Sequence, residues 1–76
     1  MENFDLRSGQ VWKHYKGGMY KIILLAKNVE EGDSVGMVVY QKEGEEQLLT
    51  QSIGRFTETV NHDGKQVPRF DFISDN

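Results

Sequence analysis

The chain has 76 residues, of which 37% are apolar and 28% charged, and its formal net charge is −3. This composition predicts one small folded domain over residues 1–76 and excludes a disordered chain. The net negative charge argues against duplex nucleic acid as a partner, and the absence of cysteine excludes disulfides and thiolate metal sites.

The beginning of the chain lacks the pattern of a signal peptide, because residues 1–6 carry two acidic side chains and no long apolar run. The longest unbroken apolar segment, residues 22–26, is too short to cross a bilayer. We therefore expect a cytoplasmic protein without a membrane partner. The lack of cysteine fits a reducing compartment.

Residues 1–8 form a polar lead-in, in which Phe4 and Leu6 are spaced to dock on one patch of the core. A first strand is expected over residues 10–16. Strand alternation puts Val11, Lys13 and Tyr15 on one face and Trp12, His14 and Lys16 on the other. Neither face is purely apolar, so the pattern leaves open which of them is buried.

The glycine pair at Gly17 and Gly18 predicts a turn, because glycine reaches the positive φ angles that tight hairpins need. A second strand is expected over residues 19–27. Its centre is apolar on both faces, which is typical of a central strand or of a strand that curves inside a small barrel. Two further strands are expected over residues 35–42 and 48–51, separated by an acidic, solvated turn.

Residues 52–56 predict an irregular connection with one turn of helix that carries Phe56 inward. Asp63-Gly64 is the strongest hairpin signal in the sequence, because it separates two β-prone runs at 57–61 and 65–73. Pro68 lies inside the last run and has no amide hydrogen to donate, so it favours a sheet edge or a bulge.

These elements predict an all-β fold, either a small single-domain curled sheet or an SH3-like barrel of five to six short strands. The expected core consists of large apolar residues from four of the predicted segments. They are Ile22, Leu24, Val39, Phe56, Phe70 and Phe72.

Three motifs follow one another along the chain. Gly9 and Trp12 precede His14-Tyr15-Lys16-Gly17 and Tyr20; Val38-Val39-Tyr40 comes next; and Phe56, Glu58 and Val60 precede Asp63-Gly64 and Val67-Pro68-Arg69-Phe70. In order and spacing, these motifs resemble a family of small bacterial and phage domains of unknown function. The resemblance covers about residues 6–73, and it implies a fold and a site but no activity.

One segment departs from the pattern of that family. Its members typically carry Trp-x-Arg-Pro just before the Phe-x-Glu motif, where this chain has Leu49, Thr50, Gln51 and Ser52. If the tryptophan and arginine of the family contact its ligand, this chain binds a different ligand or none.

No pattern in the sequence predicts catalysis or a metal site. The two histidines, His14 and His62, lack the spacing of zinc ligands. The serines fall in loops or tails without a nucleophile-elbow pattern, and the paired acids lie in polar turns where nothing would desolvate them. We therefore expect no enzymatic activity, no cofactor and no bound metal.

The opening motif predicts a ligand-binding surface, for which the candidate residues are Trp12, His14, Lys16, Tyr20 and Arg69. Lys13, Lys16 and Lys21 are expected to cluster around the aromatic rings. Rings beside cations suit stacking on a flat group and pairing with an anion. Two structural alternatives stay open: His14 can be a half-buried histidine satisfied by the backbone, and the rings can be a core rimmed by solubilising lysines.

The predicted function is that of a non-enzymatic small β-barrel module that binds a peptide or another protein. The alternative is a binder of a small anionic ligand such as a nucleotide, which a phage-encoded member could use to sequester a signalling nucleotide. A dry aromatic groove would favour the peptide, whereas a concave pocket with His14, a lysine and Arg69 would favour the anion. Association of identical copies into a homo-oligomer stays open.

Overall fold

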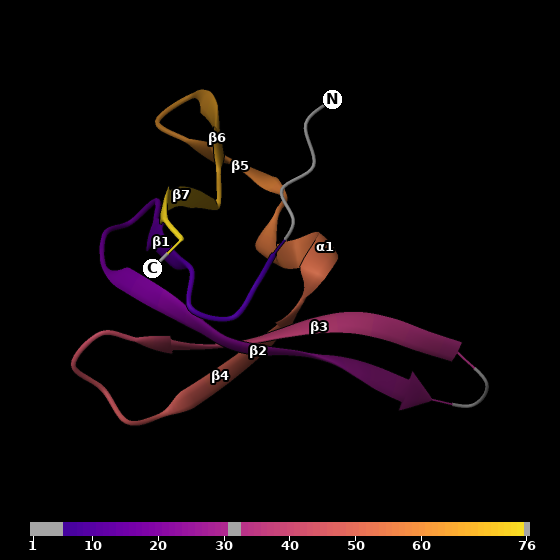
Figure 1. Cartoon of the computed structure of the whole chain (residues 1–76). Helices are drawn as coiled ribbons and strands as arrows, with labels where there is room; N and C mark the ends of the chain where they lie inside the picture. The colour runs from indigo at the N-terminus through magenta and orange to yellow at the C-terminus, as the bar shows by residue number, and fades with distance from the viewer. Residues whose placement is uncertain (1–5, 31–32, 76) are drawn as a thin grey trace.

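A computed structural model describes residues 6–30 and 33–75 of the chain (Figure 1). The described residues form seven strands and one four-residue helical turn, so the expected all-β class is confirmed and the expected number of strands was too low. The elements are β1 (Val11–His14), β2 (Met19–Glu30), β3 (Asp33–Lys42), β4 (Leu48–Ser52), α1 (Ile53–Phe56), β5 (Thr59–His62), β6 (Lys65–Pro68) and β7 (Phe70–Ser74).

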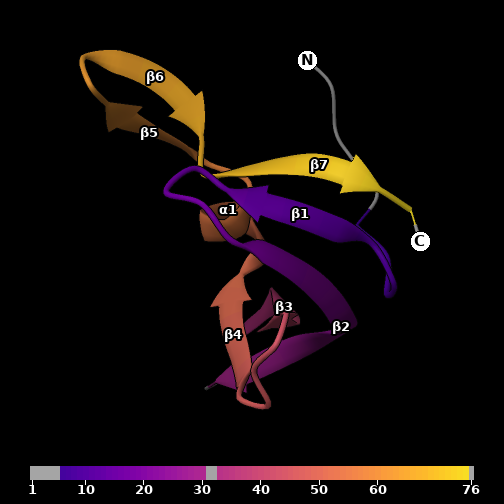
Figure 2. The same ribbon diagram turned by 90° about the vertical axis from the view of Figure 1, so that its left-hand side faces the viewer.

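Five of the strands form one antiparallel sheet in the order β4-β3-β2-β1-β7. The sheet curls, but its edge strands β4 and β7 do not pair with each other, so it remains open (Figure 2). The curled sheet is therefore the correct one of the two predicted architectures, and the closed SH3-like barrel is wrong. The long β2–β3 hairpin projects beyond the rest of the molecule (Figure 1).

The hairpin of β5 and β6 forms a separate two-stranded sheet that also projects from the body (Figure 1). Its two-residue turn consists of Asp63 at φ 54° and Gly64 at φ 78°. Positive φ at both central residues is the requirement of a type I′ turn, which Asp-Gly meets well. The strongest hairpin prediction from the sequence is thus confirmed.

The predicted last strand over residues 65–73 is in fact two strands that belong to different sheets. β6 ends at Pro68, which pairs with Thr59 at the base of the hairpin. The amide of Arg69 then donates to the carbonyl oxygen of Glu58 at 2.9 Å, and the chain turns to pair with β1. Pro68 marks the break because its nitrogen cannot donate to a further ladder bond.

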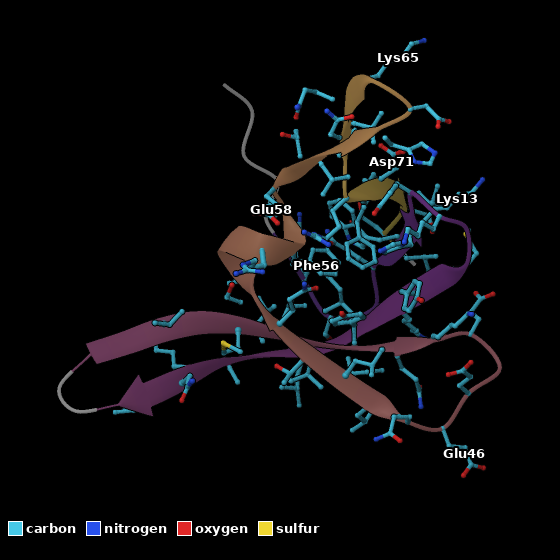
Figure 3. All side chains as sticks on the ribbon, turned by 180° about the vertical axis from the view of Figure 1, so that it is seen from behind. Lys13, Glu46, Phe56, Glu58, Lys65 and Asp71 are labelled. Carbon is cyan, nitrogen blue, oxygen red and sulfur yellow. The ribbon has the colours of Figure 1, made fainter. Side chains whose placement is uncertain are left out.

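An aromatic core fills the inner face of the curled sheet, which is the face that α1 covers. Phe56 of α1 is fully buried and points toward the sheet (Figure 3). Its ring lies edge-on to Trp12 at 5.5 Å and to Tyr40 at 5.4 Å between centroids. The buried apolar residues are Leu6, Trp12, Ile22, Val38, Tyr40, Phe56 and Phe70, with Tyr20, Ile53 and Phe72 packed against them.

Two members of the predicted core were wrongly placed, Leu24 because of a β-bulge in β2 and Val39 because of the alternation of β3. Ile22 pairs with Tyr40, but the next pair is Leu24 with Val39, so Ile23 is an extra residue. The bulge reverses the alternation, with the result that Leu24 is 46% exposed while Leu25 pairs with the fully buried Val38. Val39 stands between the buried Val38 and Tyr40 on β3, so strand alternation puts it on the outer face, opposite α1, where it is only half-buried.

The lead-in contributes to the core through Leu6, which is buried, whereas Phe4 lies outside the described residues. Gln10 follows as a buried polar side chain: its Oε1 accepts from the backbone N–H of Arg7 and from Nε1 of Trp12, and its Nε2 donates to Asp75. Among the described residues, no helix is long and apolar enough to span a membrane.

Candidate functional site

The turn between β1 and β2 is the centre of the candidate site. β1 ends at His14, two residues earlier than expected, because the backbone amides of Tyr15 and Lys16 leave the ladder. The Tyr15 amide donates to the carbonyl oxygen of Arg69 at 3.0 Å, and the Lys16 amide donates to the ring of His14. Gly17 and Gly18 then reverse the chain with φ of 104° and 96°, which side chains rarely allow.

His14 is packed among three aromatic rings at the edge of the core. Its ring centroid lies 4.7 Å from Tyr15, 5.0 Å from Phe70 and 6.1 Å from Tyr20. The Phe70 ring is buried beneath it, while His14, Tyr15 and Tyr20 are half-buried. The core therefore continues into a partly exposed aromatic surface at this turn.

The hydrogen bonds and charges around His14 fix its protonation state. Nδ1 accepts from the backbone N–H of Lys16 at 3.1 Å, so the neutral ring carries its proton on Nε2. Burial, and then the positive charges of Arg69 and Lys16, lower the pKa of His14 from its ordinary value of 6.5. At neutral pH His14 is thus an uncharged ring whose Nε2–H can donate.

Three cationic side chains lie around these rings. Lys16 is exposed, with its Nζ 5.8 Å from the centroid of the Tyr15 ring. Lys42 pairs across the hairpin with Tyr20, and its Cε would stand 3.3 Å from a Cβ placed on Gly18. Lys42 also lies 4.0 Å from Glu45, and Arg69 is paired with an acid as well.

The side chain of Arg69 is held by an ion pair and a hydrogen bond at the junction of the two sheets. Its Nη2 forms an ion pair with Oε2 of Glu58, and its Nε donates to the carbonyl oxygen of Arg55 at the end of α1 at 3.0 Å. Its guanidinium is therefore held by protein groups, although its charge acts on His14. Arg69 is suited to positioning this corner and adding positive potential, whereas Lys16 is exposed beside the Tyr15 ring.

The structure gathers four of the five predicted site residues: His14, Lys16, Tyr20 and Arg69. Trp12 lies apart in the core with 3% of its surface exposed, and its Nε1 donates to Gln10. The expected cluster of three lysines is split. Lys13 is the register partner of Asp71 on the neighbouring strand, and both side chains lie on the outer face of the sheet (Figure 3). Strand alternation puts Lys21 on the same outer face. The site is therefore the edge of the aromatic core and includes one of those three lysines.

Sequence reasoning missed two contributors to this surface, Lys42 and His62. Lys42 comes from the far strand of the β2–β3 hairpin, and its pairing with Tyr20 could be found only from the strand register. His62 of β5 is exposed, and its ring lies 5.2 Å from that of Tyr15. Tyr15 thus stands between two histidines, a contact that depends on where the β5–β6 hairpin folds.

The surface presents one neutral N–H donor on His14, the half-buried rings of Tyr15 and Tyr20, and the exposed ammonium group of Lys16. Among the described residues, no group of three or more His, Cys, Asp or Glu side chains is arranged to hold a metal ion.

A family model described as a protein of unknown function (DUF1653) matches residues 10–72, a range that includes every candidate site residue. No curated protein and no solved structure matches the chain significantly. The expected membership in a family of unknown function is confirmed, because the model of such a family matches most of the sequence. The chain belongs to the DUF1653 family of proteins of unknown function.

Proposed function

We propose that this protein is a cytoplasmic, non-enzymatic binding module that recognises an acidic peptide segment of a partner protein through the turn between β1 and β2. The binding surface consists of His14, Tyr15, Lys16 and Tyr20, with Arg69 behind it. The observation that carries the proposal is the state of His14: its Nδ1 is occupied by the Lys16 amide, which leaves Nε2–H as the donor, and the positive charge of the exposed Lys16 acts on the ring.

An acidic segment fits this chemistry better than a basic or purely apolar one. A carboxylate can accept from Nε2 of His14 and pair with Lys16, while an adjacent apolar group packs on the faces of Tyr15 and Tyr20. Duplex DNA is not proposed as a partner, because the net charge is −3 and a single exposed lysine cannot supply the many phosphate contacts of nonspecific binding.

The test begins with selection of peptides from a random display library on the immobilised wild-type protein. We expect the enriched peptides to be acidic, and we expect Lys16→Ala to weaken their binding and reduce its dependence on salt. Lys27→Ala is the matched control, because Lys27 is an exposed lysine on β2 away from the turn. Peptides that bind Lys16→Ala and wild type equally would contradict the proposal.

The pH dependence of this binding gives a second readout. An acidic group beside His14 raises its pKa above that of the free protein, so binding takes up a proton and tightens as the pH falls toward the lowered pKa of His14 in the free protein. His14→Gln should remove this dependence. An apolar peptide whose binding does not depend on pH would occupy a different surface.

A small anionic ligand such as a nucleotide is the second candidate, favoured by the positive charges of both Arg69 and Lys16 acting on His14. Titration with adenosine monophosphate, followed by the fluorescence of Trp12, separates the two. Saturable binding that displaces the selected peptide would favour the small ligand. Absence of binding at millimolar concentration would leave the peptide as the occupant.

A further inference from the structure

Lys42, the last residue of β3, borders the proposed peptide site. Strand alternation puts its side chain on the same inner face as the buried Tyr40, and strand register puts it opposite Tyr20 of β2. Tyr20 is one of the rings around His14, with 6.1 Å between the two ring centroids. Lys42 and His14 therefore both adjoin the Tyr20 ring, although they come from different strands.

The stem of Lys42 is packed over the glycine turn. A Cβ built on Gly18 would stand 3.3 Å from Cε of Lys42, 3.8 Å from its Nζ and 3.4 Å from Cε1 of Tyr20. The lysine stem and the tyrosine ring thus share the space that a side chain at Gly18 would fill. Because the Lys42 side chain is only 42% exposed, it loses less rotamer freedom on binding an anion than an exposed lysine such as Lys16.

A tight turn between β3 and β4 holds Glu45 beside this lysine. The Glu45 amide donates to the Lys42 carbonyl oxygen at 3.0 Å, which closes a β-turn. Gly44 has a φ of 87° and Glu43 does not have a positive φ, which is the pattern of a type II turn. The Glu43 amide donates to the Met19 carbonyl oxygen at 2.9 Å and so fixes the turn to the start of β2. In this arrangement Oε2 of Glu45 lies 4.0 Å from Nζ of Lys42.

The ion pair between Lys42 and Glu45 is of a kind that a ligand can exchange. The two side chains are 42% and 57% exposed, and their separation of 4.0 Å is longer than a charge-assisted hydrogen bond. Exposed pairs of this kind contribute little to stability, because water and salt screen them. A carboxylate of a ligand can therefore replace the Glu45 carboxylate at Lys42 at little cost to the fold.

We propose that Lys42 is a second anion-binding residue of the peptide site and that Glu45 competes with the ligand for it. This inference rests on the proposed function and specifies the partner more closely. The bound segment carries two acidic groups, one for His14 and Lys16 and one for Lys42, with an apolar group between them on the Tyr20 ring. Glu45 lowers the affinity, because its ion pair with Lys42 has to be exchanged when the second acidic group binds.

Three substitutions separate the ion pair from the general charge of the turn. Lys42→Met removes the ammonium group and keeps an unbranched apolar stem over Gly18. Glu45→Gln removes the competing charge at nearly constant size. Glu46→Gln is the matched control, because Glu46 is exposed, points away from the sheet (Figure 3) and forms no ion pair with any described residue. Thermal melts by circular dichroism verify that each variant is folded.

The experiment measures the affinity of the most enriched acidic peptide by isothermal titration calorimetry. We expect Lys42→Met to weaken binding about threefold or more and Glu45→Gln to tighten it about two- to fivefold, the range of an exposed ion pair. In the Lys42→Met background, Glu45→Gln should have no more effect than Glu46→Gln, because the ammonium group for which Glu45 competes is gone.

The peptide itself provides the complementary test. Its acidic residues are replaced one at a time by the corresponding amides. One of these replacements should weaken binding to wild type and leave binding to Lys42→Met unchanged, which would identify the acidic group that Lys42 contacts. A different replacement should behave in the same way toward Lys16→Ala.

Unchanged binding by Lys42→Met would overturn the proposal, because it would exclude Lys42 from the site. Equal effects of Glu45→Gln and Glu46→Gln would also overturn it, since the turn would then act only through its net charge. In both cases the proposed function stands as long as Lys16→Ala weakens binding of the same peptide. If Lys16→Ala binds as tightly as wild type, the proposed function fails, and the role of Lys42 fails with it.

Discussion

The rings of Phe56 and Phe70 stack face to face, with their centroids 4.1 Å apart and their planes 9° from parallel. Phe56 ends α1, and Phe70 begins β7 on the edge of the large sheet. The stack therefore joins the only described helical turn to an edge strand, and it lies directly beneath the His14 ring, which is edge-on to Phe70. The core and the candidate site share this pair.

Truncation of Phe70 should unfold the protein. Phe70→Ala removes a ring that is 4% exposed and contacts Phe56, Tyr40 and Tyr20. Such truncations cost about 3–5 kcal/mol, comparable with the whole stability of a domain of this size. A circular dichroism melt should show a largely unfolded variant at 25 °C. Ile73→Ala is the control, because Ile73 is 46% exposed on the same strand. If Phe70→Ala melts like wild type, the Phe70 ring does not contribute to the core.

Loss of the Arg69 side chain should destabilise the junction between the two sheets. Arg69→Ala removes the bonds to the Glu58 carboxylate and to the Arg55 carbonyl. We expect the free energy of unfolding, measured with urea, to fall by about 1–2 kcal/mol. The loss is smaller than for a buried ion pair, because the Glu58 side chain is 39% exposed. Arg55→Ala keeps the carbonyl acceptor and should change stability little, so equal losses in both variants would contradict this role.

The stability of the protein should depend on pH through His14. Burial and two cations lower the pKa of folded His14, so the unfolded chain binds the proton more readily. This contribution to stability is complete above pH 6.5 and is lost as the pH falls from 6.5 to the lower folded pKa. Urea unfolding across this range should show a steeper fall for wild type than for His14→Gln. Identical slopes would show that His14 does not titrate differently on folding.

Substitutions of the neighbouring turn residues Tyr15 and Lys16 should affect different properties, stability in the first case and peptide binding in the second. Tyr15 is half-buried between two histidine rings, so Tyr15→Ala should lower the melting temperature measurably. Lys16 is exposed, and Lys16→Ala should change stability by less than about 0.5 kcal/mol while weakening peptide binding. If both substitutions destabilise the fold equally, the turn is structural and the binding site lies elsewhere.

Local signals in the sequence predicted much of the fold. The Asp63-Gly64 hairpin followed from turn chemistry, and the burial of Ile22, Phe56 and Phe70 followed from apolar patterning. One core error arose where a single extra residue changed the register of β2. The bulge at Ile23 moved Leu24 out of the core, and an Ile-Ile-Leu-Leu run carries no mark that shows where a bulge falls. Sheet closure could not be predicted, since it depends on how far two edge strands curl.

The candidate site was predictable in composition but not in geometry. The motif pointed to His14, Lys16 and Tyr20, and these residues do lie together. The sequence could not show that Trp12 faces the core, because both faces of the predicted strand mixed aromatic and basic residues. It also could not place Lys42 or the β5–β6 hairpin, whose positions depend on strand pairing and on the turn at Arg69.

Amide chemical-shift mapping tests the central claim most directly. The ¹⁵N-labelled protein is titrated with an acidic peptide enriched by selection on wild type. We expect the largest shifts at Tyr15, Lys16, Gly17 and Tyr20, with a smaller change at Arg69, and saturation only at higher peptide concentration with Lys16→Ala. Shifts centred on β4, with the turn between β1 and β2 unchanged, would contradict the assignment of this turn as the binding surface.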